Sequence, residues 1–267
     1  MGSHIREIKP DADTSYYFRV GLAGKCIEVE CMYKETYRAY RDYADQKSEP
    51  DAYIKISYND ILETKRILSQ DRIPNISVEE DNIAITYDTG HLEPLALQRK
   101  ISDIMPSFNT YLMHGSVVAK DDYAYMFTAP SGTGKTTRTR LWLEEYPGSF
   151  VVCGDKPLIE IKENEAVAYG TPWGGKEGWN TNTKAPLKAI FLLERADDTQ
   201  ENTVEEIDIG KAFPFLIRQI YCPTDSVSIK KLITLFRALD GKTKIFRFRS
   251  TPTREAVRLA FETVEKG

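Results

Sequence analysis

The chain has 267 residues, of which 41% are hydrophobic and 28% are charged. This ordinary composition excludes collagen-like, strongly disordered and membrane-embedded proteins, and the length suffices for one large domain or two modest ones. The net charge is −4, with basic residues scattered along the chain, which argues against nucleic acid as the main partner.

No apolar run approaches the roughly 18 residues that span a bilayer, and the start of the chain lacks the basic, apolar and small-residue order of a signal peptide. We therefore expect a cytoplasmic protein without a membrane partner. Residues 1–14, which begin with MGSH like an expression tag, are expected to form a disordered tail. The four cysteines form no C-x-x-C pair and only three histidines accompany them, so the pattern does not indicate a zinc site.

Residues 15–100 are predicted to form a small β-rich α+β region. Short strand-like runs alternate there with polar turns, and one stretch, YNDILETKRIL at 58–68, has helical spacing. The strand-like runs are YYFRV at 16–20, CIEVECMY at 26–33, AYIKISY at 52–58 and IAITYDT at 83–89. The next stretch, LALQRKISDIMPSFNTYLM at 95–113, has helical spacing with Pro106 inside it, which predicts one or two helices that lead into the next domain.

Residues 101–267 are predicted to form an α/β (α+β) domain in which helices flank a mixed β-sheet. Two apolar runs, at 114–120 and 122–129, are separated by charged residues and suggest a hairpin. Further strands are predicted at 150–155, 186–194 and 244–249, and further helices at 134–146, 228–239 and 252–267.

The stretch MFTAPSGTGKTT at 126–137 comes close to a Walker A loop, G-x-x-x-x-G-K-[ST]. Its last three positions are satisfied, whereas Ala129 replaces the first glycine. Because the stretch lies between a predicted strand and a predicted helix, its backbone N–H groups and the helix dipole are expected to bind phosphate. Lys135 would then reach the β- and γ-phosphates of ATP, while the Thr136 hydroxyl would join the coordination of Mg²⁺. The predicted nucleotide-binding residues are Ser131, Gly132, Thr133, Gly134, Lys135, Thr136 and Thr137.

A carboxylate at the end of a neighbouring strand usually completes such a Mg²⁺ site. Asp155 ends the run FVVCGD, and one helix and one turn separate it from Lys135, so its strand can lie beside the strand that feeds the loop. The alternative is that Asp155 only begins a turn with Lys156. His114 starts the strand predicted to pair with the loop-bearing strand, which makes it a candidate catalytic residue, although a lone histidine is more often structural.

A glycine-rich segment, YGTPWGGKEGWNTNTK at 169–184, precedes the predicted strand at 186–194. Its glycines make it pliable, and it carries groups for stacking, charge and hydrogen bonding, so it is interpreted as a binding lid. A structural glycine-rich turn is the alternative. Lys176 is a candidate to contact transferring phosphate, and Glu177 to assist metal or acceptor binding. The candidate substrate-binding residues are Trp173, Lys176, Glu177 and Asn180. Arg247 and Arg249, two apart in a predicted strand, share one of its faces and either contact a ligand or form a solvated edge.

Taken together, HGSVVAKDDYAYMFTAPSGTGKTT and VVCGDKPLI resemble the HPr serine kinase/phosphorylase family. That family carries an HG-[AS] segment, a loop of the form x-x-S-G-x-G-K-[ST] and an acidic pair soon after it. The residues that match are His114, Gly115, Ser116, Ser131, Gly132, Gly134, Lys135 and Thr136. The resemblance covers about residues 105–267 and implies a phosphoenolpyruvate carboxykinase-like fold, whose atypical Walker A loop accounts for Ala129.

Two features depart from the family pattern. Gly154 and Asp155 stand where the acidic pair is expected, so one carboxylate is missing, which puts reversible phosphorolysis in doubt. The N-terminal region is unlike the amino-terminal domain of the bifunctional enzyme. The chain is therefore more similar to the broad group of HPr kinase-like proteins, some of which occur beside peptide-modification genes.

The expected activity is an ATP- and Mg²⁺-dependent phosphotransferase for a hydroxyl acceptor, and the resemblance implies a serine in a protein or peptide. Asp155, together with His114, would position or deprotonate the acceptor. Two alternatives stay open, namely a kinase for a polyol or other small metabolite, and a nucleotide-sensing interaction module that has lost turnover. The family also implies a homo-oligomer.

Overall fold

The computed structural model describes residues 15–46, 49–70, 89–197, 199–223 and 225–266. The chain divides into two compact units, 1–101 and 102–267. The predicted tail at 1–14 lies outside the described residues, as does the predicted strand at 83–89 apart from its last residue. Within the described ranges, no helix is both long and apolar enough to cross a membrane.

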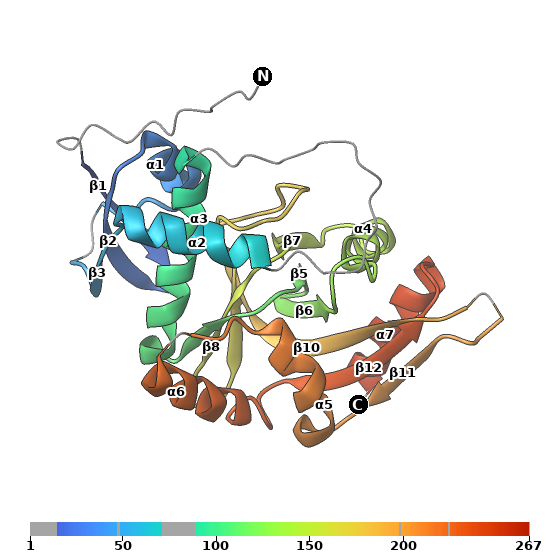
Figure 1. Cartoon of the computed structure of the whole chain (residues 1–267). Helices are drawn as coiled ribbons and strands as arrows, with labels where there is room; N and C mark the ends of the chain where they lie inside the picture. The colour runs from blue at the N-terminus through green and yellow to red at the C-terminus, as the bar shows by residue number, and fades with distance from the viewer. Residues whose placement is uncertain (1–14, 47–48, 71–88, 198, 224, 267) are drawn as a thin grey trace. The chain divides into compact units, whose positions relative to one another are not determined.

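The first unit contains a three-stranded sheet in the order β1–β2–β3 (Figure 1). β1 (Tyr16–Leu22) and β2 (Lys25–Cys31) form an antiparallel hairpin, and β3 (Ala52–Lys55) runs parallel to β2. The two residues of the hairpin turn, Ala23 and Gly24, have φ of 49° and 72°, as expected where a two-residue turn must match the twist of its strands. The helices of this unit are α1 (Lys34–Tyr40), η1 (Arg41–Tyr43), α2 (Tyr58–Gln70) and α3 (Thr89–Ile104).

A buried carboxylate closes the amino end of α1. The residue before the helix, Tyr33, provides no side-chain cap. Glu93 of α3 lies at this end, where its carboxylate accepts from the N–H groups of Met32 and Tyr33 at 2.7 and 2.9 Å and from the Thr36 hydroxyl at 2.5 Å. Burial raises the pKa of Glu93, while these three hydrogen bonds oppose that rise. A residue far along the chain thus accepts from the N–H of the N-cap residue, the contact that the glutamate of a capping box normally makes.

The second unit is organised around the long strand β10 (Lys184–Arg195), which lies in the middle of a mixed nine-stranded sheet. β6 (Tyr123–Thr128) and β12 (Lys244–Ser250) run parallel to β10 on either side. β5 (Ser116–Lys120) pairs antiparallel with β6, and β7 (Phe150–Cys153) pairs antiparallel with β5.

The remaining strands extend this sheet at two places. The first residues of β10 pair antiparallel with β9, which continues through β8 to β4, and β11 pairs antiparallel with β12. Their bounds are β4 (Thr110–Leu112), β8 (Leu158–Ile161), β9 (Ala166–Tyr169) and β11 (Thr203–Glu206). The short helix η2 (Met105–Phe108) leads from α3 into β4.

Helices cover both faces of the sheet, as the alternation along β10 shows. Phe191 and Leu193 pack with α4 (Lys135–Glu145) and α7 (Arg254–Lys266), whereas Ile190 and Leu192 pack with the helices of the opposite face. Burying each such side chain contributes about 1.5–3 kcal/mol, which fixes the strand between two apolar layers. The helices of the opposite face are α5 (Ile209–Leu216), η3 (Ile217–Gln219) and α6 (Ser226–Arg237).

Several sequence predictions agree with these elements and several do not. The hairpin at 114–129, the central strand at 186–194 and the closing helix at 252–267 are confirmed as β5–β6, β10 and α7. The helical prediction for 95–113 is wrong at its end, because residues 110–112 form β4 and pair with β8. β7 does not lie beside β6 as expected, since β5 separates them. Hydrophobic spacing in the sequence did not predict α1, β8, β9, β11 and α5, most of which are short.

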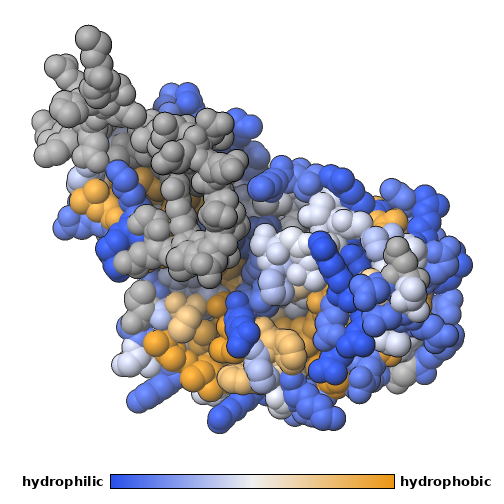
Figure 2. All heavy atoms as spheres, turned by 45° about the vertical axis from the view of Figure 1, so that its right-hand side comes forward, coloured by the Kyte–Doolittle hydropathy of each residue, from blue (hydrophilic) through white to orange (hydrophobic). Residues whose placement is uncertain are grey.

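The surface is mostly charged or polar on the face drawn in Figure 2, where an apolar patch interrupts it in the lower part. Exposed apolar side chains of the second unit include Phe150, Phe215 and Val227. The four cysteines, all within the described ranges, form no disulfide, and only Cys222 is exposed.

Replacement of Glu93 by Ala should destabilise the first unit. The substitution leaves two backbone donors and one hydroxyl without their acceptor, so we expect a loss of about 2–4 kcal/mol and faster amide exchange at the start of α1. Hydrogen exchange measured by mass spectrometry over residues 31–43 checks this. Glu93→Gln keeps one acceptor oxygen and should lose less; equal exchange in wild type and Glu93→Ala would contradict the capping role.

Candidate phosphate-binding site

The glycine loop connects the end of β6 at Thr128 to the start of α4 at Lys135. Gly132 and Gly134 have φ of 80° and 110°, values that a side chain rarely tolerates. A Cβ on Gly134 would also lie 2.5 Å from Nη1 of Arg138, which would have to shift. Ala129, in contrast, is buried against the core and is not among the described residues with positive φ. The loop therefore needs no glycine at the position where the Walker A pattern has its first one.

The Lys135 side chain folds back over this loop. Its ammonium donates to the carbonyl oxygens of Ala129 at 2.9 Å and Pro130 at 3.4 Å, and only 8% of the residue is exposed. Burial lowers the pKa of Lys135, and the charge of Asp155 opposes that shift. Because Lys135 is also the first residue of α4, the positive end of the helix dipole adds to its charge. The loop, the helix end and the ammonium together form an anion-binding arrangement.

A cavity of about 570 Å³ lies over the loop. Its lining consists of glycines and polar or charged side chains from the second unit, namely His114, Ser131, Gly132, Gly134, Lys135, Thr136, Thr137, Gly154, Asp155, Gly174, Gly175, Lys176, Glu177 and Arg195. The fold thus brings together the predicted loop residues except Thr133, the two catalytic candidates outside the loop, and two of the four candidate substrate residues. Trp173 and Asn180 do not line the cavity.

Asp155 and His114 are held together by backbone and side-chain contacts. Oδ1 of Asp155 lies 3.3 Å from Nε2 of His114, and the Gly115 N–H donates to the Asp155 carbonyl at 2.7 Å. Burial alone would raise the pKa of Asp155, but the His114 hydrogen bond and the charges of His114, Lys156 and Lys135 hold it below its usual range. Asp155 is therefore a carboxylate at neutral pH.

The other ring nitrogen of His114 is also occupied. Nδ1 lies 3.0 Å from Oε1 of Gln219, and the His114 N–H donates to the Gln219 carbonyl at 2.6 Å. With both nitrogens engaged, the imidazole is placed to orient Asp155 rather than to take a proton from an acceptor. Gln219 follows His114 by 105 residues, and no sequence pattern pointed to it.

Gly154 explains why one acid of the expected pair is missing. A Cβ at this position would lie 2.6 Å from the carbonyl oxygen of Gly174 and 3.1 Å from that of Trp179, and the Gly154 N–H donates to the Trp179 carbonyl at 2.7 Å. The backbone of the 170–181 segment fills the space from which a second carboxylate would start. Gly175 is equally constrained, since its φ is 74° and a Cβ there would lie 2.9 Å from Cβ of Asp155.

The same segment is attached to α4. Oε2 of Glu177 lies 2.5 Å from Nη2 of Arg140, whose guanidinium also lies over the Trp179 ring at 5.6 Å. Lys176 borders the cavity next to Glu177, and both are exposed. The ionic contact places Glu177 beside the cavity mouth, although its carboxylate is engaged by a cation.

Divalent-metal ligands in the cavity are few. No group of three or more His, Cys, Asp or Glu residues that could hold a metal ion occurs in the described ranges. Thr136 and Asp155 both line the cavity, and one hydroxyl with one carboxylate fits the usual protein share of a Mg²⁺ site, in which phosphate oxygens and waters fill the other positions.

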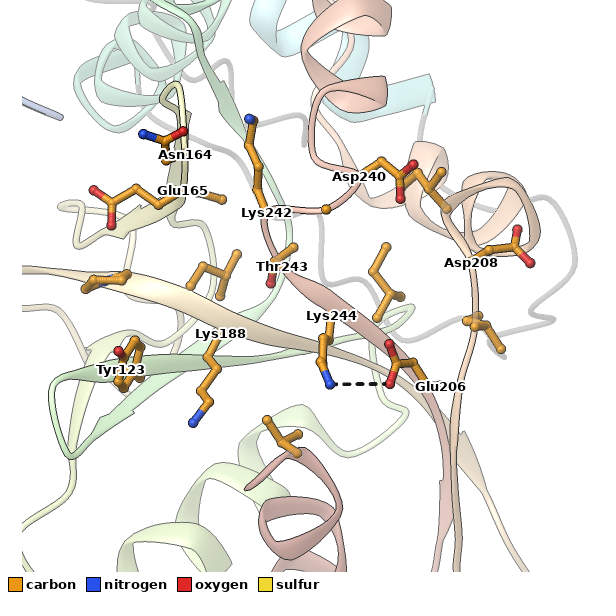
Figure 3. A pocket seen from close by; sticks show the side chains of 18 of the residues that line it. Tyr123, Asn164, Glu165, Lys188, Glu206, Asp208, Asp240, Lys242, Thr243 and Lys244 are labelled. Atoms are coloured by element: carbon orange, nitrogen blue, oxygen red, sulfur yellow. Dashed lines mark ion pairs between the residues drawn. The ribbon is translucent and has the colours of Figure 1, made fainter. Parts of the chain in front are cut away.

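A larger cavity, of about 890 Å³, lies at the opposite ends of the parallel strands (Figure 3). Aliphatic side chains form part of its lining, and several of its charged side chains are engaged within the protein. Lys244 faces Glu206 at 3.6 Å, Lys188 contacts both oxygens of Glu265 at 2.7 Å, and Lys242 donates to a backbone carbonyl. Ligand sites of open α/β sheets lie at the carboxyl ends of the strands, where the smaller cavity and its loop are found.

Replacement of Gly154 by Asp should destabilise the second unit. The new Cβ collides with backbone, so we expect a loss of about 2 kcal/mol or more and displacement of the 173–180 loop. Gly178→Asp is the matched control. Its φ is also positive, at 64°, but a Cβ there would have no atom within 4 Å, so this variant should lose only about 1 kcal/mol of unfolding free energy. Urea unfolding followed by circular dichroism measures the stability of both variants. A Gly154→Asp variant as stable as wild type would show that the 173–180 loop moves aside without cost.

Comparison with known proteins gives distant structural likenesses only. No family model matches the chain, and no curated protein matches it either. Among solved structures, the HPr(Ser) kinase/phosphatase from Coxiella burnetii is similar at 13% sequence identity, over 58% of this chain and 88% of that chain, with a TM-score of 0.33. This degree of likeness is a distant structural relationship over part of the chain.

Proposed function

We propose that residues 102–267 form an ATP- and Mg²⁺-dependent phosphotransferase that phosphorylates a hydroxyl group, with a serine of a protein or peptide as the acceptor. The observation that carries this proposal is the shared cavity, in which Lys135 and Thr136 at the start of α4 meet Asp155 from the end of β7. The serine acceptor rests on the sequence resemblance of the loop and its flanking segments.

The glycine loop and Lys135 would bind the phosphates of the donor. The loop presents backbone N–H groups at the positive end of α4, and the two left-handed glycines let the backbone approach phosphate oxygens closely. The Lys135 ammonium, which now donates to two loop carbonyls, would exchange one of them for a phosphate oxygen. Such an exchange needs little motion, because the aliphatic stem is already buried against the loop.

Thr136 and Asp155 are the residues that would hold Mg²⁺. When bound, the metal would neutralise charge on the phosphates of the donor.

Asp155 would also receive the proton of the acceptor. The acceptor oxygen forms a bond to the γ-phosphorus, the bond from that phosphorus to the β-phosphate oxygen breaks, ADP leaves, and the hydroxyl proton passes to the carboxylate. His114 and Gln219 would keep the carboxylate oriented, because Gln219 contacts the His114 ring and the ring contacts the Asp155 carboxylate. A carboxylate with a lowered pKa is a weak base, which suits a loose transition state in which proton transfer comes late.

Lys135→Ala should abolish transfer and weaken ATP binding strongly, whereas Asp155→Asn should lower turnover by about 10²–10⁴-fold while ATP affinity changes far less. The difference arises because Lys135 would bind phosphate directly in the ground state, whereas Asp155 would provide only one of several Mg²⁺ ligands and would otherwise act on the acceptor. Isothermal titration with ATP and turnover with the identified acceptor separate the two effects. Lys162→Ala, which removes a lysine paired with Glu165 outside the cavity, is the control. Normal turnover in Asp155→Asn would show the assignment of that residue to be wrong.

The acceptor class can be found with γ-labelled ATP, Mg²⁺ and a cell extract fractionated by size, comparing wild type with Lys135→Ala. Label in a macromolecule that depends on Lys135 is the expected result. Label in a small product would instead indicate a metabolite kinase. ATP binding without any Lys135-dependent label would favour a nucleotide-sensing module, which is the outcome that the loss of an acid at Gly154 would explain.

A further inference from the structure

Arg195 lies at the edge of the phosphate cavity, on a different strand from the glycine loop. It is the last residue of β10, three residues beyond the final pair that β10 makes with β6, Leu192 with Thr128. Its guanidinium therefore reaches the loop that follows β6, where Nη2 donates to the Gly132 carbonyl. Arg195 lines the same cavity as Lys135, Thr136 and Asp155.

No carboxylate contacts the Arg195 guanidinium among the described residues. The adjacent acid, Glu194, is engaged by two other arginines of β12, Arg247 at 3.2 Å and Arg249 at 3.1 Å. The one described partner of Arg195 is thus a backbone oxygen, and a guanidinium carries five N–H donors. The exposed cation keeps donors for a ligand with several oxygens.

A second arginine makes the excess of positive charge larger. Arg138 of α4 is 3% exposed and donates through Nη2 to the Ser250 carbonyl at 2.6 Å and to the Ser250 hydroxyl at 3.1 Å. Burial lowers the pKa of Arg138, and the nearby charge of Arg195 lowers it further. Three cations, Lys135, Arg138 and Arg195, thus surround the loop, and Asp155 is the cavity carboxylate that is not engaged by an arginine. An anion of several charges would relieve their mutual repulsion.

We propose that Arg195 is a further catalytic residue, whose guanidinium exchanges the Gly132 carbonyl for oxygens of the transferring phosphoryl group. This role rests on the phosphotransferase function proposed above. Arg195 gains and loses no covalent bond in the step, which moves the phosphoryl group from a nucleoside triphosphate to the acceptor hydroxyl. Its contribution is to stabilise the negative charge on the oxygens of the transferring group in the transition state.

Arg195 and Lys135 have separable roles in this scheme. Lys135 is buried and fixed to the loop, so it contacts phosphate whether or not transfer is under way. Arg195 is exposed at a strand end and must leave a hydrogen bond with the loop to reach phosphate. An interaction formed chiefly in the transition state lowers turnover when it is removed and leaves ground-state binding nearly intact.

The test compares Arg195→Met and Arg195→Lys with the matched control Arg249→Met, which removes an arginine engaged by Glu194 outside the cavity. Arg195→Met should lower kcat by about 10³-fold or more, as expected for an arginine that stabilises transferring phosphate, while the Kd for ATP changes by less than about tenfold. Arg195→Lys keeps the positive charge but lacks the paired N–H donors, so its kcat should lie between those of wild type and Arg195→Met. Arg249→Met should turn over like wild type.

Binding of ADP with Mg²⁺ and aluminium fluoride gives a second readout that needs no acceptor. Fluoroaluminate mimics the transferring group, so it should tighten ADP binding in wild type and in Arg249→Met and fail to do so in Arg195→Met, with thermal unfolding confirming that each variant is folded. Equal tightening in Arg195→Met, or a kcat within about threefold of wild type, would overturn the role of Arg195. If wild type itself neither binds ATP nor transfers phosphate, the proposed function fails, whatever Arg195 does.

Discussion

The close approach of two backbone segments determines the geometry of the candidate site. β7 ends at Cys153, and Gly154 and Asp155 follow it. The 170–181 segment packs directly on this end, with the Gly154 N–H bound to the Trp179 carbonyl at 2.7 Å and the Thr181 N–H bound to the Val152 carbonyl at 3.4 Å. The Thr181 hydroxyl adds a bond to the Val152 carbonyl at 3.1 Å. Glycines at the contact allow the backbones to meet, and the carboxylate of Asp155 is thereby fixed over the loop that follows β6.

The same contact changes the chemistry available to the site. The space from which a second acid would start at position 154 is filled by the Gly174 and Trp179 carbonyls, so in the proposed reaction a single carboxylate would serve both the metal and the proton. Its orientation depends on His114 and Gln219. Around it the loop gathers more positive than negative charge, which favours a polyanionic ligand over a neutral one.

Local features of the second unit could be predicted from the sequence, but long-range partners could not. The glycine loop and the hairpin before it were predictable because turn residues and apolar alternation act within a few positions. Asp155 was predictable as a strand end, although the order of strands was not, since β5 lies between β6 and β7 and only tertiary pairing decides that. Gln219 and Arg195 come from elements distant in sequence, and Glu93 caps α1 from a helix about 60 residues away, so no local pattern could reveal them. The short strands β8, β9 and β11 have four residues each, too few for a periodic signal.

The distribution of tryptophan gives the protein an optical property of its own. The three tryptophans all belong to the second unit. Trp142 is fully buried among aromatic rings, 4.9 Å from Tyr125, whereas Trp173 and Trp179 lie in the segment that borders the cavity. Trp179 lies beneath the guanidinium of Arg140, the same residue that holds Glu177. Movement of this segment would therefore change the environment of the Trp173 and Trp179 indole rings while Trp142 serves as a constant internal reference, so intrinsic fluorescence would report on the cavity mouth without a label.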